Sequence, residues 1–404
     1  MKTVAITSAV RTAVGSYLKS LKDIPPQDLI AQILPELIRR SGIDSFDVEH
    51  IIIGNVLAPT PNIARVAGLL AEIDEKVPAF TVNRLCASSL QAVINAYQSI
   101  VSGESKVVLA GGVESLSRAP YFLSEEIRSK GLRCGDSAIV DSFSYASENA
   151  QPQNLYPYLN MGLTAENIAK RYSISRVQQD NFAYESQQKY RKAKQQNSFE
   201  DEICSISIID GKNTIPFSND EHPRPEITLE KLSMLGPAFT EGGTVTAGNS
   251  SGLNDGASAL IVMSDEAANK YQAPILARIV SYAVVGVSPI LMGLGVVPSI
   301  HLALERAGLD FSDIDLFEIN EAFAAQVVGC LIELGVESNS SFLSKLNVNG
   351  GAIALGHALA NSGTRMLATL IYELRRREKK YGLVSMCVGG GQGVTIIVKN
   401  NMSF

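Results

Sequence analysis

The sequence predicts an α/β protein made of two related α/β domains, with a more polar segment inserted before the first domain closes. The main observation is an internal repeat. Residues 42–53 (GIDSFDVEHIII) align with residues 308–319 (GLDFSDIDLFEI) at an interval of 266, and Val82-Asn83 precedes Val348-Asn349 by the same interval. Each copy shows an amphipathic helix, a Gly-led turn, an Asp-rich connection and a buried strand, which is typical of a layered α/β unit. Chance similarity between two α/β units is the alternative explanation.

The spacing of the repeat changes after Val348-Asn349. The strand predicted at residues 107–112 (VVLAGG) aligns with residues 385–390 (SMCVGG) only at an interval of 278, so we place 12 extra residues in the second copy. These extra residues include His357, whereas the first copy carries Cys86 at the opening of a helix. Two halves that diverge at such positions indicate one site shared between the domains.

The inserted segment differs in composition from the two domains. Between residues 120 and 243 the sequence shifts toward Ser, Gln, Asn and charged residues, and we expect helices near residues 164–172 and 175–195 and a loop at 219–225. Long connections of this kind more often form lids or binding surfaces than structural padding. The predicted N-terminal domain is 1–119 with 244–270, the inserted loop domain is 120–243, and the C-terminal domain is 271–404.

Composition and charge exclude several classes of function. The 404 residues are 46% hydrophobic and 19% charged, which is typical of a globular protein large enough for more than one domain. The net charge of −6 provides no positive field for nucleic acid or an anionic membrane. The apolar runs end before membrane-spanning length. We therefore expect no nucleic-acid or membrane partner, and an anionic ligand would depend on local donors.

The cysteines indicate a reducing compartment. Five of them are scattered along the chain without close pairs, which argues against both a disulfide framework and a metal site. The N-terminal apolar run is too short for a signal peptide, and residues 401–404 match no peroxisomal address. We expect a cytoplasmic protein without a metal.

Cys86 is the first candidate for chemistry. It lies in residues 82–92 (VNRLCASSLQA), where an extended apolar stretch meets small residues and then a helical pattern. A thiol at a helix N-terminus faces unpaired N–H groups and the helix dipole, so we expect a pKa below the ordinary value of about 8.5. A buried, inert cysteine is the simpler alternative.

His357 is the candidate base. It belongs to the glycine-flanked segment 350–358 (GGAIALGHA), at the mouth of the extra residues of the second copy, and is one of only four histidines. A neutral imidazole takes a thiol proton near pH 7, although most loop histidines are structural.

Two further segments combine a strand end with a polar group. Cys387 begins residues 387–393 (CVGGGQG), where glycines let backbone N–H groups approach a ligand. A dinucleotide fingerprint is disfavoured, because residues 395–398 continue as a strand rather than a helix. We expect this turn, which includes Gly389, to direct N–H groups at a developing oxyanion beside a second thiol. Asn320, in residues 318–324 (EINEAFA), is either a helix cap or a donor aimed into a cleft, and capping is the stronger alternative.

Together with residues 161–167 (MGLTAEN) and 245–257 (VTAGNSSGLNDGA), these four segments resemble the thiolase family over nearly the whole chain. The resemblance implies a five-layered α-β-α-β-α fold and acyl transfer between coenzyme A thioesters. Cys86 would be the acylated nucleophile, His357 its activator, and Cys387 the shuttle for the proton of the acyl group. Asn320 would hold a water that forms one oxyanion hole with His357, and the N–H groups of Cys86 and Gly389 would form the other.

The resemblance also implies the ligand and its contacts. Acyl-CoA and CoA would be substrates or products, with no separate cofactor, and a homotetramer, or at least a dimer, is expected. The residues expected to contact CoA or the acyl group are Arg224, Ser251, Ala247, Met161, Met292 and Phe323.

Some residues depart from the family pattern. Ala358 replaces the proline that usually follows the histidine, and Ala13 replaces another common proline. Asn160 stands where short-chain biosynthetic thiolases carry a histidine, and residues 145–158 do not follow their usual pattern. The acyl-chain length is therefore the least determined property.

Three functions compete. The first is an acetyl-CoA C-acetyltransferase, and the second is a 3-ketoacyl-CoA thiolase for longer chains in β-oxidation. The third is a thiolase-like acyl-CoA binder without turnover, which the presence of all four chemical groups disfavours. A ketoacyl synthase would require a histidine at position 320, where this chain has asparagine.

Overall fold

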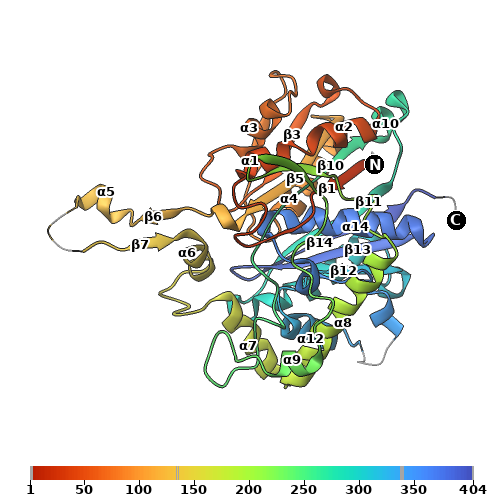
Figure 1. The fold of residues 1–404 in the computed structure, drawn as a ribbon. Helices are drawn as coiled ribbons and strands as arrows, with labels where there is room; N and C mark the ends of the chain where they lie inside the picture. Colours follow the sequence, from red (N-terminus) through yellow and green to blue (C-terminus); the bar gives the residue numbers. More distant parts are fainter. Residues whose placement is uncertain (1–2, 133, 135, 337–340, 403–404) are drawn as a thin grey trace.

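The structure is a computed structural model that describes residues 3–132, 134, 136–336 and 341–402. Its centre is one ten-stranded mixed sheet with two halves of the same design (Figure 1). In each half, a parallel strand pair continues into antiparallel strands. The order of the first half is β4 (Ala79–Val82), β3 (His50–Gly54), β5 (Val107–Ser115), β10 (Asn254–Ser264) and β1 (Val4–Arg11), with β2 (Gly15–Ser16) beside β10. The second half continues with β11 (Ala277–Gly286), β14 (Gln392–Asn400), β13 (Tyr381–Val388) and β12 (Leu316–Ile319).

The repeat at an interval of 266 is structural. Gly42 and Gly308 both end a helix in the left-handed conformation, with φ of 73° and 63°. Asp44 and Asp310 then each open a 3₁₀ helix with a capping box. The later interval of 278 was wrong. In the first half Val108 pairs with His50 at the start of β3, and in the second half Gly382 pairs with Leu316 at the start of β12. Val108 and Gly382 are therefore the equivalent residues, and the interval between them is 274. The second copy therefore has eight extra residues rather than twelve.

The sheet halves enclose two central helices, α4 (Ser88–Ser102) and α14 (Ser362–Arg376). Strand alternation sorts the side chains between layers. On β5, Val108 and Ala110 pack toward the central helices, whereas Val107 and Leu109 belong to the outer core. On β13, Val384 faces inward and Leu383 outward. This arrangement is the predicted five-layered α-β-α-β-α fold.

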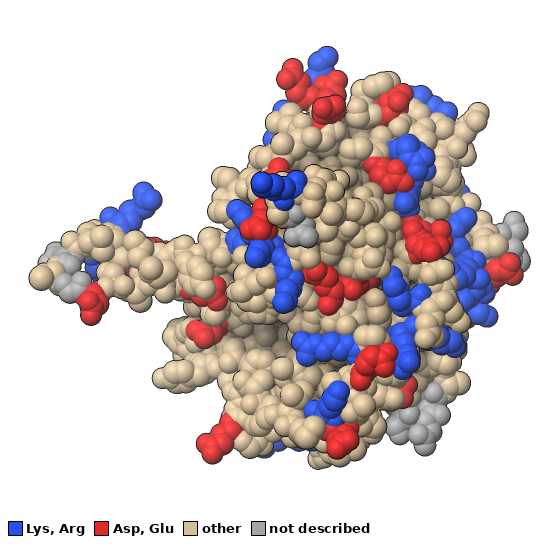
Figure 2. All heavy atoms as spheres, in the orientation of Figure 1, with Lys and Arg blue, Asp and Glu red and all other residues tan. Residues whose placement is uncertain are grey.

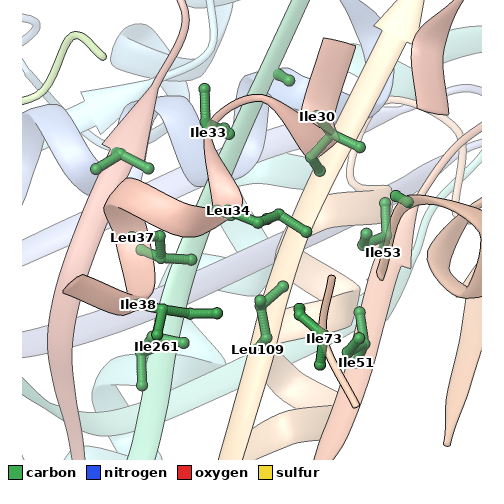
Figure 3. Close-up of a cluster of buried hydrophobic side chains, with 14 of the residues drawn as sticks. Ile30, Ile33, Leu34, Leu37, Ile38, Ile51, Ile53, Ile73, Leu109 and Ile261 are labelled. Atoms are coloured by element: carbon green, nitrogen blue, oxygen red, sulfur yellow. The ribbon is translucent and has the colours of Figure 1, made fainter. Parts of the chain in front are cut away.

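Helices cover both outer faces of the sheet. Figure 3 shows Leu34 lying over Leu109 and Leu37 lying over Ile261, in a core whose members are almost fully buried. Burial of each such side chain stabilises the fold by roughly 1.5–3 kcal/mol. The helices of this face are α1 (Pro26–Ala31), α2 (Leu34–Ser41), α3 (Ile63–Leu70) and α10 (Asp265–Tyr271). The opposite face carries α11 (Val296–Ala307) and α12 (Ala324–Glu333), and the short α13 (Ala352–Leu355) lies against α8.

The inserted segment forms an arm and a helical cover. The arm projects from the body (Figure 1) and comprises β6 (Tyr121–Leu123), α5 (Glu126–Lys130) and β7 (Ile139–Asp141). The predicted helices at 164–172 and 175–195 are α7 (Met161–Arg171) and α8 (Arg176–Gln195), and Ser175 caps α8. The remaining elements are α6 (Ser142–Glu148), the hairpin β8 (Ile206–Asp210) and β9 (Asn213–Phe217), and α9 (Leu229–Ser233). The exact domain boundaries stay a prediction.

One helical segment, Pro289–Ala307, is long and apolar enough to cross a membrane by length and composition. It lies instead in the protein core, where Val296, Ile300 and Ala303 are buried against the outer face of the sheet. A helix that is buried in a protein core is expected to be this apolar, so its composition does not require a membrane.

Candidate active site

Cys86 lies in the turn between β4 and α4. As predicted, it precedes the helix, which begins two residues later at Ser88. Leu85 has a φ of 45°, an uncommon conformation for a residue with a side chain, and Ser88 Oγ donates a hydrogen bond of 2.7 Å to its carbonyl. This tight turn orients the thiol at the open end of α4.

Two backbone N–H groups interact with the sulfur of Cys86, its own and that of Gly389. They are the pair that the resemblance assigns to an oxyanion hole. Enclosure of the sulfur nevertheless raises the pKa of the Cys86 thiol to about 11, and these N–H groups offset the effect only in part. The prediction of a lowered pKa was therefore wrong, because loss of solvent outweighs the helix terminus.

His357 is a buried side chain, 5% exposed, rather than a loop group in solvent. Its ring Nδ1 lies 2.7 Å from Ser362 Oγ, and its backbone N–H donates to Asn254 Oδ1 at 3.0 Å. The other ring nitrogen, Nε2, has no hydrogen-bond partner among the described residues. Burial, with a smaller effect from nearby Arg365, lowers the pKa of His357 to about 4. The imidazole is therefore neutral at pH 7 and offers one unoccupied nitrogen.

Asn320 does not cap a helix. Helix α12 begins at Ala324 without a side-chain cap, so the stronger alternative offered by the sequence was wrong. The Asn320 side chain is 1% exposed, and neither its Oδ1 nor its Nδ2 has a partner among the described residues. An unsatisfied buried amide costs roughly 1–3 kcal/mol, so this side chain is available to bind a polar group of a substrate or a water.

Cys387 is 1% exposed at the end of β13. Burial raises the pKa of its thiol well above the ordinary value, and interaction with the Cys86 thiol raises it further. The two thiols therefore influence each other although they come from different halves of the chain. At rest, Cys86, Cys387 and His357 are all uncharged.

The topology brings these groups to one region. The parallel strands β12 and β13 end side by side, so Asn320 and Cys387 lie at the same sheet edge. The starts of α4 and α14 also meet, because Ser89 Oγ accepts the Thr364 N–H at 3.0 Å. Cys86 precedes the first helix and His357 the second.

The acyl-binding candidates adjoin this centre. A side chain at Gly389 would lie 3.4 Å from the sulfur of Met161, so Met161 borders the turn that carries the Gly389 N–H. Met292 is buried, and Met161 packs against the core cluster that contains it. The rings of Phe323 and Phe239 are in contact, with their centroids 5.8 Å apart. The Phe239 ring also lies over Gly162, the residue after Met161. These contacts form an apolar wall.

The CoA-binding candidates lie farther out. Ser251 donates its N–H to the Ala322 carbonyl at 3.0 Å, which joins the loop of Ser251 to the segment that follows Asn320. Ala247 and Arg224 are exposed. The ring of His222 covers Gly252, next to Ser251. Burial, with a smaller effect from nearby Arg224, lowers the pKa of His222 to about 4.

Two departures from the family pattern have a local explanation. Asn160 is the N-cap of α7, since its Oδ1 accepts the Leu163 N–H at 3.0 Å. Asparagine is among the best residues for this position. Ala358 has a φ of −74°, close to the value that proline imposes, so the backbone of this turn is compatible with the proline usual in the family.

Sequence reasoning missed three residues of this site. Ser362 and Asn254 form hydrogen bonds with His357. The third residue, the buried Glu114, accepts the Val56 N–H at 3.1 Å and the Ala360 N–H at 3.3 Å. Its carboxylate therefore links a loop of the first half to a loop of the second. Burial raises the pKa of Glu114 to about 7. No residue type or spacing indicates such partners, because each acts across a long sequence separation or within an irregular turn. Among the described residues, no cluster of His, Cys, Asp or Glu could hold a metal ion.

Known proteins share this architecture along the whole chain. The N-terminal thiolase domain model matches residues 4–266, and the C-terminal one matches 273–400. The chain is 45% identical over 401 residues to the acetyl-CoA acetyltransferase of Escherichia coli (strain K12), covering 99% of both chains. It is 42% identical over 398 residues to the beta-ketothiolase BktB of Cupriavidus necator, covering 98% of both.

Solved structures of thiolases have the same fold as this chain. A crystal structure of the Bacillus anthracis acetyl-CoA acetyltransferase has a TM-score of 0.93 at 40% identity, and one of human mitochondrial 3-ketoacyl-CoA thiolase has 0.92 at 42%, each covering 99% of both chains. The repeat, the five layers and these full-length similarities together show that the chain belongs to the thiolase family.

Proposed function

We propose that the protein is an acetyl-CoA C-acetyltransferase, which condenses two acetyl-CoA molecules to acetoacetyl-CoA and CoA or catalyses the reverse thiolysis. The environment of Cys86 is the observation that supports this activity most strongly. Two N–H groups interact with its sulfur, and a neutral His357, whose Nε2 has no partner in the part of the chain that the structure describes, precedes the adjoining central helix. This arrangement suits a nucleophile that loses its proton only as it attacks.

The first half-reaction would acetylate Cys86. Its sulfur attacks the thioester carbonyl of acetyl-CoA while His357 Nε2 takes the thiol proton. The bond to the CoA sulfur breaks, His357 returns the proton to that sulfur, and CoA leaves. The N–H groups of Cys86 and Gly389 would stabilise the oxyanion, an interaction whose loss typically costs about 10²–10³ in kcat.

The second half-reaction would form the carbon–carbon bond. The Cys387 thiol would first pass its own proton to the neutral His357, and the resulting thiolate would take a proton from the methyl group of a second acetyl-CoA. The carbanion attacks acetyl-Cys86 and displaces its sulfur, which takes the proton back from His357. Asn320 and His357 would stabilise the enolate oxygen through a bound water. Neither the amide of Asn320 nor Nε2 of His357 has a hydrogen-bond partner among the described residues, which supports this assignment.

Acylation can be tested directly. After incubation with acetyl-CoA, peptide mass spectrometry should find one acetyl group on Cys86, and Cys86→Ala should abolish acyl transfer. Acetylation confined to Cys387 or to another cysteine would overturn the assignment.

A longer-chain 3-ketoacyl-CoA thiolase is the second candidate. It is favoured by the similarity to human mitochondrial 3-ketoacyl-CoA thiolase and by Asn160, whose oxygen is occupied by helix capping. Met161 and Met292 favour the shorter substrate, because flexible thioethers fill apolar space that a longer chain would need. Comparison of kcat/KM for acetoacetyl-, 3-ketohexanoyl- and 3-ketodecanoyl-CoA decides between them. A clear preference for the ten-carbon substrate would assign the protein to β-oxidation.

CoA itself would be a substrate or product, held by Arg224 and Ser251. A structure of the human mitochondrial thiolase has been solved in complex with CoA, and this chain covers 98% of it at 41% identity. Arg224→Ala should raise the KM for CoA, while acetylation of Cys86 at saturating acetyl-CoA persists.

We also propose a cytoplasmic homotetramer. The arm supports assembly, since Tyr121, Leu123 and Ile139 are 67%, 48% and 70% exposed. Figure 2 shows few charged atoms along the middle of the arm. Five free cysteines fit a reducing compartment. Light scattering of the wild type and of Ile139→Glu tests the assembly, and cell fractionation tests the location.

A further inference from the structure

Among the described residues, only one nitrogen of the His357 ring has a hydrogen-bond partner. Its Nδ1 contacts Ser362 Oγ at 2.7 Å, and Ser362 Oγ is in turn 3.0 Å from the Ala358 carbonyl oxygen. All three residues are 5% exposed or less, so no bulk water competes for these contacts. The hydroxyl therefore stands between one ring nitrogen and one carbonyl.

We propose that Ser362 is a positioning residue that holds His357 in the tautomer with its proton on Nδ1. In this state the ring N–H donates to Ser362 Oγ, and the single hydroxyl hydrogen donates to the Ala358 carbonyl, so both hydrogens are bonded. In the opposite tautomer the hydroxyl must donate to Nδ1. The proton on Nε2 then has no acceptor among the described residues, and an unpaired buried N–H is strongly disfavoured.

The consequence is a free lone pair on Nε2, the nitrogen that a base must present to its substrate. Asn254 complements this effect at the backbone. Its Oδ1 accepts the His357 N–H at 3.0 Å, while its Nδ2 donates to the Gly15 carbonyl at 3.0 Å. Asn254 thus fixes the position of the residue, and Ser362 fixes which nitrogen carries the proton. This role rests on the proposed function, because only a base requires one tautomer.

Ser362→Ala tests the proposal. Alanine is a good helix former at the first position of α14, so the variant should fold. Without the acceptor, both tautomers become populated. We expect kcat for thiolysis to fall roughly tenfold, the size of one lost buried hydrogen bond, with KM for CoA unchanged. Ser362→Thr restores the hydroxyl and should restore most of kcat.

A spectroscopic readout separates this role from a structural one. In protein labelled with ¹⁵N-histidine, His357 is assigned by comparison with His357→Asn. The wild type should show a protonated Nδ1 and an unprotonated Nε2, whereas Ser362→Ala should show intermediate shifts. Thr364→Val is the matched control, because it removes a buried hydroxyl of the same helix that contacts Ser258 rather than His357. It should keep the wild-type tautomer and kcat.

Two outcomes would overturn the proposal. One is a Ser362→Ala variant with wild-type kcat and an unchanged tautomer, and the other is a reduced kcat with His357 still protonated on Nδ1 alone. The NMR result does not depend on turnover. A wild-type protein that fails to acetylate Cys86 would therefore refute the proposed function while the tautomer could still be measured.

Discussion

The guanidinium of Arg11 forms two hydrogen bonds with the carboxylate of Asp220, Nη1 to Oδ1 at 2.7 Å and Nη2 to Oδ2 at 3.1 Å. Both side chains are almost completely buried, and Arg11 Nε also donates to Glu202 at 2.6 Å. Asp220 lies four residues before Arg224. The ion pair therefore ties the segment that presents Arg224 to strand β1.

Removal of one partner of this pair should be costly. Asp220→Ala leaves a buried cation less compensated, and we expect the free energy of unfolding to fall by about 3–5 kcal/mol. Glu226→Ala is the control, since its 3.7 Å contact with Arg191 is largely exposed and should contribute less than about 1 kcal/mol. Urea denaturation of both variants measures the difference. Equal losses of unfolding free energy in the two variants would show that the buried ion pair stabilises the fold no more than the exposed one.

Asn320 should be dispensable for folding. Asn320→Leu removes a buried amide that has no partner in the described part of the chain, so we expect the free energy of unfolding to stay constant or to rise by about 1 kcal/mol. Condensation should fall by about 10²–10³, the typical loss for one oxyanion donor. Asn249→Leu is the matched control, because its amide makes hydrogen bonds with Thr246, Asp180 and Thr244. It should lose at least about 2 kcal/mol. Comparable destabilisation in both variants would contradict this account.

The pH dependence of Cys86 should reveal its resting state. Only the thiolate is alkylated, and the pKa of this thiol is raised to about 11, so reaction with iodoacetamide should keep accelerating above pH 9. Unfolded protein, with an ordinary cysteine pKa of about 8.5, should level off earlier. His357, with a pKa of about 4, stays neutral over the same range and adds no step. Rates between pH 6 and 10 measure this, and a plateau below pH 8 would indicate a preformed thiolate.

Cys387→Ala should separate the two half-reactions. The variant keeps the nucleophile and the two N–H groups around its sulfur, so acetyl-Cys86 should still form. Condensation should fall by about 10²–10⁴, as is typical when a general acid or base is lost. Mass spectrometry follows the first step, and acetoacetyl-CoA production follows the second. Near wild-type condensation would make this thiol structural.

Local patterns in the sequence were sufficient for much of this description. The repeat at 266 predicted the duplicated domains, because Gly42 and Gly308 end helices through their own backbone freedom and Asp44 and Asp310 cap the 3₁₀ helices after them. The helix after Cys86 was also predicted, since hydrophobic periodicity acts over a few residues. The strand after the glycine turn of Cys387 was predicted from the same kind of pattern.

The electrostatic state of the site depended on tertiary structure. The sequence placed Cys86 at a helix terminus and predicted a low pKa, yet desolvation by the packed domains reversed the sign. The absent cap at Asn320, the contact between His357 and Ser362, and the pairing of Arg11 with Asp220 were likewise decided by the fold. Periodicity and capping are encoded locally, whereas solvent exclusion and long-range partners exist only after distant segments have packed together.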